Sequence, residues 1–259
     1  MYLPVPSQPD CFSAWLEAVR LVDAEPGHHA HNVIIDVQDP TARASMSDPA
    51  VAAVSQFLAD HDKKPVETVA NTIFPAGLYT RYGAPAFFDR FRDDVLPKVR
   101  RSEDWSGYYF ERMMHLPQVE GDPINQLWEI VGRLRNPNVR ALNKFELSIF
   151  DAARDLNDSP YGGQCLSFAS LKLVGKPDAR RLTMTAFYRN HFYIEKLLGN
   201  LIGLGRLLKF LAVEGGVEMG SLTIVSTHAE IDMAKWGRHD FLELVQICDQ
   251  ANAEHAVAV

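Results

Sequence analysis

The stretch CLSFASLKLVGKPDARRLTMTAFYRN, residues 165–190, decides the fold class of this chain. Its first part, from Cys165 to Val174, alternates apolar and polar residues, and RLTMTAFYRN alternates again at the end of the stretch. Such a period of two is typical of strands with one buried face, and the Gly and Pro between the two parts are typical of a turn. The stretch therefore predicts an antiparallel hairpin with Cys165 at its head.

The segments around this hairpin predict an α+β fold. YIEKLLGNLIGLGRLLKFLAVE, residues 193–214, carries apolar residues at helical spacing around most of its circumference, which indicates a buried helix. GSLTIVST, residues 220–227, predicts a strand that ends at His228, and HNVIIDVQDP, residues 31–40, predicts another that is closed by a turn. Strands separated by buried helices favour the α+β class.

Three further helices are predicted in the first half of the chain. One covers Phe12 to Val22, and a second covers residues 48–62, where a helix-start signal precedes apolar residues at helical spacing. The third is DPINQLWEIVGRLRNPN, residues 122–138, with Asp122 as its expected cap and Pro123 at its first position.

Composition places the chain among ordinary globular proteins. Of 259 residues, 47% are hydrophobic and 23% charged, and the formal net charge is -7. No linker rich in Pro, Gly or Ser divides the chain, so we expect a single domain over residues 1–259. The acidic balance gives no general attraction to nucleic acid polymers or to membranes, and an anionic ligand must therefore meet a local cluster of cationic side chains.

The cysteines and the amino terminus predict a cytoplasmic protein. Cys11, Cys165 and Cys248 are odd in number and widely spaced, without a CxxC pair, which argues against a disulfide framework and a zinc site. The amino terminus lacks the pattern of a signal peptide, and no uncharged apolar stretch is long enough for a membrane span. We expect no metal.

Four motifs in chain order resemble the thymidylate synthase and pyrimidine nucleotide hydroxymethylase superfamily. They are a cysteine heading a strand, FYRN ending the next strand, LLGN near the start of the buried helix, and STHAE closing the last strand. The resemblance implies a thymidylate synthase-like fold, in which helices flank one large mixed sheet, and a homodimer formed through a sheet face. It also implies a pyrimidine nucleoside monophosphate as substrate and methylene-tetrahydrofolate as cofactor.

The chemistry of the pyrimidine ring gives these residue types a purpose. C5 of the ring is a poor nucleophile, but a thiolate that adds to C6 makes C5 enolate-like and able to attack a one-carbon electrophile. Cys165 is the predicted nucleophile. A guanidinium favours the thiolate and also binds phosphate through two parallel hydrogen bonds, and Arg189 is the predicted group for both tasks.

The resemblance implies roles for other residues near the nucleophile. Asn200 would read the edge of the pyrimidine ring, with a uracil-type base favoured and a cytosine-type base close behind. His228 would face the ribose hydroxyl, and Glu230 would accept a hydrogen bond from a sugar hydroxyl. Ser170 stands where the family has a glutamine, and is included among the substrate-binding candidates.

Three candidates come from the first two thirds of the chain. Glu67, in PVETVANTIFP, matches a family glutamate that organises water and proton transfer at the pyrimidine carbonyl. Tyr108, which directly follows Gly107, matches a tyrosine that assists removal of the C5 proton, although Tyr109 is the alternative. Arg140 resembles an arginine that reaches the partner subunit's phosphate.

Several positions depart from the family pattern and leave the reaction open. Leu166 replaces a histidine, and Phe192 stands where an aspartate would contact the folate pterin. The sequence therefore favours a divergent methyl- or hydroxymethyltransferase. Two alternatives remain: a non-catalytic protein that keeps the fold for nucleotide binding or dimerisation, and an unrelated α+β protein in which Cys165 is a core residue.

Overall fold

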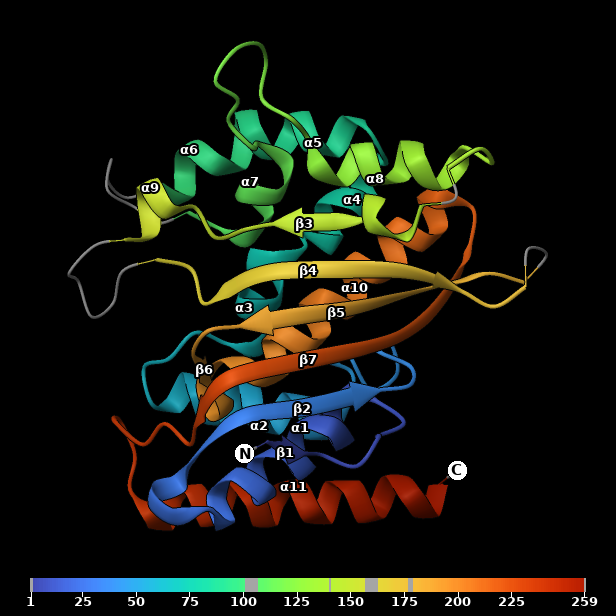
Figure 1. The fold of residues 1–259 in the computed structure, drawn as a ribbon. Helices are drawn as coiled ribbons and strands as arrows, with labels where there is room; N and C mark the ends of the chain where they lie inside the picture. Colours follow the sequence, from blue (N-terminus) through green and yellow to red (C-terminus); the bar gives the residue numbers. More distant parts are fainter. Residues whose placement is uncertain (1, 101–106, 140, 157–162, 177–178, 259) are drawn as a thin grey trace.

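The computed structural model describes residues 2–100, 107–139, 141–156, 163–176 and 179–258. It confirms an α+β architecture in which helices flank one large mixed sheet of seven strands (Figure 1). The strands are β1 (Leu3–Pro4), β2 (His29–Val37), β3 (Glu146–Ser148), β4 (Leu166–Val174), β5 (Arg181–Tyr188), β6 (His191–Phe192) and β7 (Glu218–Glu230). Their order across the sheet is β1-β2-β7-β5-β4-β3, and β6 pairs with β7.

The helices occupy both halves of the chain. The α-helices are α1 (Cys11–Ala24), α2 (Pro49–Asp60), α3 (Val66–Ile73), α4 (Ala76–Tyr82), α5 (Ala86–Arg90), α6 (Leu96–Val99), α7 (Tyr109–Met114), α8 (Gln126–Arg135), α9 (Ala152–Asp155), α10 (Leu198–Gly215) and α11 (Arg238–Ala258). The 3₁₀ helices are η1 (Pro26–His28) and η3 (Leu142–Lys144), and the π-helices are η2 (Phe91–Val95) and η4 (Tyr193–Leu197). None of the helices described is long and apolar enough to cross a membrane.

The predicted hairpin is confirmed. β4 and β5 pair antiparallel, with Ala169 opposite Ala186, while β5 runs parallel to β7. Alternate residues of β5 are buried, and this face of the sheet packs against helices, as the period of two predicts.

The described helices leave the opposite face of the sheet open (Figure 1). Figure 1 shows α1, α3 and α10 behind the sheet. An apolar row crosses four strands on the open face, because Phe187 lies beside both Val225 and Phe168, and Val225 lies beside Ile34. Phe187 is 39% exposed. Homodimer formation through this face stays a prediction.

Helix α10 is the buried helix that the sequence predicts, and it determines where the cavity forms. Two of its glycines allow α3 to approach closely: a Cβ on Gly199 would lie 2.6 Å from the Cβ of Val69, and one on Gly203 would lie 2.8 Å from the carbonyl oxygen of Ala70. This close packing brings Asn200, in the first turn of α10, beside α3.

The start predicted for the third helix is wrong. Helix α8 begins at Gln126 and is capped by Asn125, whose side chain accepts a hydrogen bond from the backbone N–H of Trp128. The helix does not begin at Asp122 because the backbone of Ile124 exchanges two hydrogen bonds with that of Leu116, each 2.9 Å long. Those bonds hold the backbone extended.

Candidate active site

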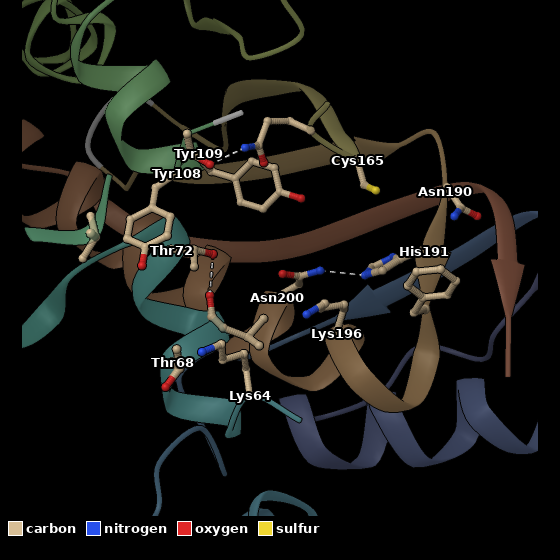
Figure 2. A pocket seen from close by; sticks show the side chains of 15 residues that line it. Lys64, Thr68, Thr72, Tyr108, Tyr109, Cys165, Asn190, His191, Lys196 and Asn200 are labelled. Atoms are coloured by element: carbon tan, nitrogen blue, oxygen red, sulfur yellow. Dashed lines mark hydrogen bonds between the residues drawn. The ribbon is translucent and has the colours of Figure 1, made fainter. Parts of the chain in front are cut away.

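A cavity of about 510 Å³ brings together residues from five parts of the chain (Figure 2). They come from Lys64 and helix α3, from Val99 at the end of α6, from the start of α7, from the segment that leads into β4, and from the segment that runs from Asn190 through η4 into α10. Its polar lining residues are Lys64, Thr68, Thr72, Tyr108, Tyr109, Gln164, Cys165, Asn190, His191, Lys196 and Asn200. Three of the predicted site residues, Cys165, Tyr108 and Asn200, therefore line one cavity.

Cys165 stands directly before β4, and its sulfur points into the cavity (Figure 2). Burial raises the pKa of this thiol, whereas the charges of Arg189 and Lys196 lower it and that of Asp155 raises it. The net effect is a raised pKa. Arg189 thus acts on the thiol in the expected direction, but desolvation outweighs it, and Cys165 is a neutral thiol at neutral pH.

Arg189 lies beside the cavity and does not line it. Its backbone N–H donates to the carbonyl oxygen of Cys165 over 2.9 Å, which ties the two residues across the hairpin. Its Nε donates to the carbonyl oxygen of Gln164 over 3.1 Å, and its guanidinium lies over the ring of Phe150 at 5.4 Å. These contacts hold the charge close to the thiol.

A buried ion pair that the sequence did not reveal holds the segment before Cys165. The carboxylate of Asp155 accepts hydrogen bonds from both terminal nitrogens of Arg112, over 2.5 and 2.8 Å. It also accepts one from the backbone N–H of Gln164 over 3.3 Å, and the Gln164 side chain donates to the carbonyl oxygen of Gly107. This pair therefore positions the residue next to the thiol.

Of the two adjacent tyrosines, Tyr109 is the one beside the nucleophile. Its hydroxyl accepts a hydrogen bond from the backbone N–H of Leu166 over 3.4 Å, whereas Tyr108 extends toward Thr72 (Figure 2). Helix α7 begins at Tyr109, so the two side chains diverge. Burial and the nearby Cys165 raise the pKa of Tyr109, which keeps its hydroxyl protonated. The sequence favoured Tyr108 only because it follows Gly107.

Asn200 is 3% exposed and is held by a histidine that the sequence did not single out. Its Nδ2 donates to Nε2 of His191 over 2.9 Å (Figure 2). Nδ1 of His191 in turn lies 2.9 Å from the hydroxyl of Ser226. An amide anchored in this way can present a fixed hydrogen-bonding edge to a ligand.

Glu67 lies on the face of α3 that points away from the cavity, contrary to the expected role at the pyrimidine carbonyl. Its carboxylate accepts two hydrogen bonds from Arg206, each 2.8 Å long. Thr68 and Thr72, which are four residues apart, face the cavity instead. The rotation of α3 against α10 therefore puts threonine hydroxyls where a glutamate was expected.

Ser170 also lies away from the cavity, on the sheet face that the helices leave open. Its hydroxyl donates to Glu146 over 3.1 Å and accepts from Nζ of Lys172 over 2.5 Å. Arg140 lies outside the described residues.

His228 meets the cavity only through another residue. Its Nδ1 lies 2.6 Å from Oδ1 of Asn190, which lines the cavity. His228 also packs against His31, with ring centroids 5.3 Å apart. Burial lowers the pKa of His228, electrostatic interaction with His31 and His29 lowers it further, and the charge of Glu230 raises it. Glu230 itself does not line the cavity.

The cavity is cationic although the chain is acidic. Lys64 and Lys196 line it, and none of its described lining residues is an aspartate or glutamate. Lys196 pairs with Glu195 over 2.7 Å, whereas Lys64 makes no ion pair with any residue in the described ranges. Such a lining suits an anionic ligand. No metal-binding group of three His, Cys, Asp or Glu occurs among the described residues.

No family model matches the chain, and no curated protein matches it.

Proposed function

We propose that this cavity binds a pyrimidine nucleoside monophosphate and that Cys165 adds to C6 of the ring, which activates C5 for one-carbon transfer. The observation that carries the proposal is the meeting of Cys165, Asn200 and Tyr109 in one cationic cavity. The thiol supplies the nucleophile, the amide supplies donors and acceptors for the ring edge, and the lysines suit the phosphate. A uracil-type base is favoured over a cytosine-type base.

The addition needs a path for the thiol proton, because the pKa of Cys165 is raised. The sulfur forms a bond to C6, and the electron pair of the C5–C6 double bond moves toward C5 and the group at C4. The thiol proton leaves to water, and C5 can then take up a proton from the medium. Loss of the original C5 hydrogen as a proton and release of the sulfur restore the ring, so no oxidant or reductant is consumed. The Tyr109 hydroxyl, which accepts a hydrogen bond from the backbone N–H of Leu166 next to Cys165, would pass a proton during these steps.

The cavity fits methylene-tetrahydrofolate only in part. Lys64 and Lys196 are the cationic side chains among the described lining residues, so the carboxylates of a folate tail would compete for them with the phosphate of the nucleotide. The pterin ring, however, presents N–H donors, and no described lining residue offers it a carboxylate, since Phe192 lines the cavity and Glu67 faces away. No step is therefore derived through the folate.

The competing proposal is a non-catalytic nucleotide-binding protein. The raised pKa of Cys165 and the missing carboxylate favour it. The direction of the sulfur into the cavity opposes it, because a protein that only binds has no need of a thiol there.

Tritium release distinguishes the two proposals. The wild-type protein is incubated with dUMP, UMP, dCMP and CMP labelled at C5, with and without methylene-tetrahydrofolate. We expect release from at least one nucleotide and its loss in Cys165→Ala. Glu67→Gln is the matched control, and it should keep the wild-type rate because Glu67 faces Arg206. If a nucleotide binds but no tritium is released, the result would support the non-catalytic protein. If no nucleotide binds and no tritium is released, both proposals are refuted.

A further inference from the structure

His191 lies at the centre of a buried hydrogen-bond network behind the cavity. The network links Tyr193 to Ser226, Ser226 to His191, and His191 to Asn200. The His191 ring is 2% exposed and stacks on Tyr188, with ring centroids 4.0 Å apart and planes inclined by 11°. Stacking on one side and hydrogen bonds at both nitrogens leave the ring no freedom to rotate.

The protonation of this ring follows from its surroundings. Burial lowers the pKa of His191 to about 3, so the ring is neutral at physiological pH and carries one proton. Because Nδ2 of Asn200 can only donate, Nε2 of His191 must be the acceptor. The proton therefore sits on Nδ1, where it is donated to the hydroxyl oxygen of Ser226.

This tautomer determines which edge Asn200 shows to the cavity. With one N–H committed to His191, the carbonyl oxygen and the second N–H of the amide are left for a ligand, and Oδ1 accepts from no residue in the described part of the chain. A flipped amide would set its oxygen against the lone pair of Nε2. Uracil and cytosine differ in which of positions 3 and 4 donates and which accepts, so the two bases require opposite amide orientations.

We propose that His191 is a positioning residue that fixes the amide of Asn200 through its Nδ1–H tautomer and so decides between uracil and cytosine nucleotides. This inference rests on the proposed function for its ligand. The position of the proton and the orientation of the amide are properties of the protein without a ligand.

Ser226→Ala tests the inference because it removes the acceptor of the Nδ1 proton. A buried N–H without an acceptor costs more than a buried lone pair without a donor, so the proton should move to Nε2 and the amide should turn its oxygen to the ring. Imidazole ¹⁵N NMR at neutral pH reports the tautomer, with the His191 signal assigned by its absence in His191→Gln. Binding of UMP, dUMP, CMP and dCMP reports the base preference.

Tyr193→Phe is the matched control. It deletes the 3.3 Å hydrogen bond that Tyr193 donates to Ser226, but it leaves the serine oxygen available to His191. We expect the Nδ1–H tautomer and the wild-type base preference in this variant. In Ser226→Ala we expect the Nε2–H tautomer and a change of about tenfold or more in the ratio of uracil to cytosine nucleotide affinities.

Two results would overturn the inference. One is an Nε2–H tautomer in the wild-type protein, and the other is a base preference that stays within about threefold in Ser226→Ala. If the wild type binds none of the four nucleotides, the proposed function fails. In that case the His191 tautomers in the wild type and in Ser226→Ala would be the only test of whether His191 fixes the amide of Asn200.

Discussion

Replacing Asp155 by asparagine should reduce stability and at the same time make Cys165 more acidic. The side chain of Asp155 is 0% exposed and that of its partner Arg112 is 3% exposed. Removing one partner of a buried ion pair costs about 3–5 kcal/mol, because the remaining charge is left uncompensated. An asparagine still offers one oxygen to Arg112 or to Gln164, so we expect a loss near the lower end, about 3 kcal/mol.

The expected loss is large enough to measure directly. In a domain of this size each kcal/mol shifts the melting temperature by about 2–4 °C, so Asp155→Asn should melt about 6–12 °C below the wild type. The charge of Asp155 also raises the pKa of Cys165, so its removal should lower the pH at which iodoacetamide alkylates the thiol. General destabilisation does not predict that second change.

The pH dependence of the loss has a definite sign. Burial raises the pKa of Asp155, but hydrogen bonds from Arg112 and from the backbone outweigh it and hold the pKa below its usual range. The stabilisation is therefore complete above the unfolded pKa, near 3.8, and disappears as the pH falls through the lower folded pKa. The difference in melting temperature between wild type and variant should shrink accordingly in acid.

Asp151→Asn is the control for this experiment. Asp151 is a neighbouring carboxylate that, among the described residues, accepts from the backbone N–H of Ala153 alone, over 3.0 Å, so its replacement should cost about 1 kcal/mol or less. If Asp155→Asn melts within about 2 °C of the wild type, or leaves the alkylation profile of Cys165 unchanged, the role assigned to the ion pair is refuted.

Two further predictions concern charged residues that do not line the cavity. Arg189→Gln should raise the pKa of Cys165 and shift its alkylation profile to higher pH. The control Arg135→Gln, which breaks an ion pair with Glu214, should not. If Arg189→Gln has the same alkylation profile as the wild type, Arg189 does not act on the thiol. Burial raises the pKa of Asp232 from 3.8 to about 7, so the folded state binds the extra proton and stability should fall by up to about 4 kcal/mol as the pH rises between these values. Urea unfolding between pH 5 and 8 should show this slope in the wild type and lose it in Asp232→Asn; equal slopes would contradict the assignment.

The sequence alone determined the elements whose pattern is local. The alternation in the Cys165 stretch predicts the β4–β5 hairpin because a strand exposes successive residues on opposite faces. The apolar circumference of residues 193–214 predicts α10 because such a helix can only be buried. The four motifs in chain order, and the family that they resemble, also pointed to Cys165 and Asn200, which line one cavity in the structure.

Only the tertiary structure decided what surrounds the thiol. Packing of α3 on the glycines of α10 turned Thr72 toward the cavity and Glu67 toward Arg206, a rotation that no local pattern encodes. The same holds for the pKa of Cys165, since Arg189 opposes a desolvation that exists only once the chain has folded. Residue types and spacing follow from the sequence. The direction in which each side chain points, and whether burial or a nearby charge dominates the pKa of the thiol, follow from packing between distant segments.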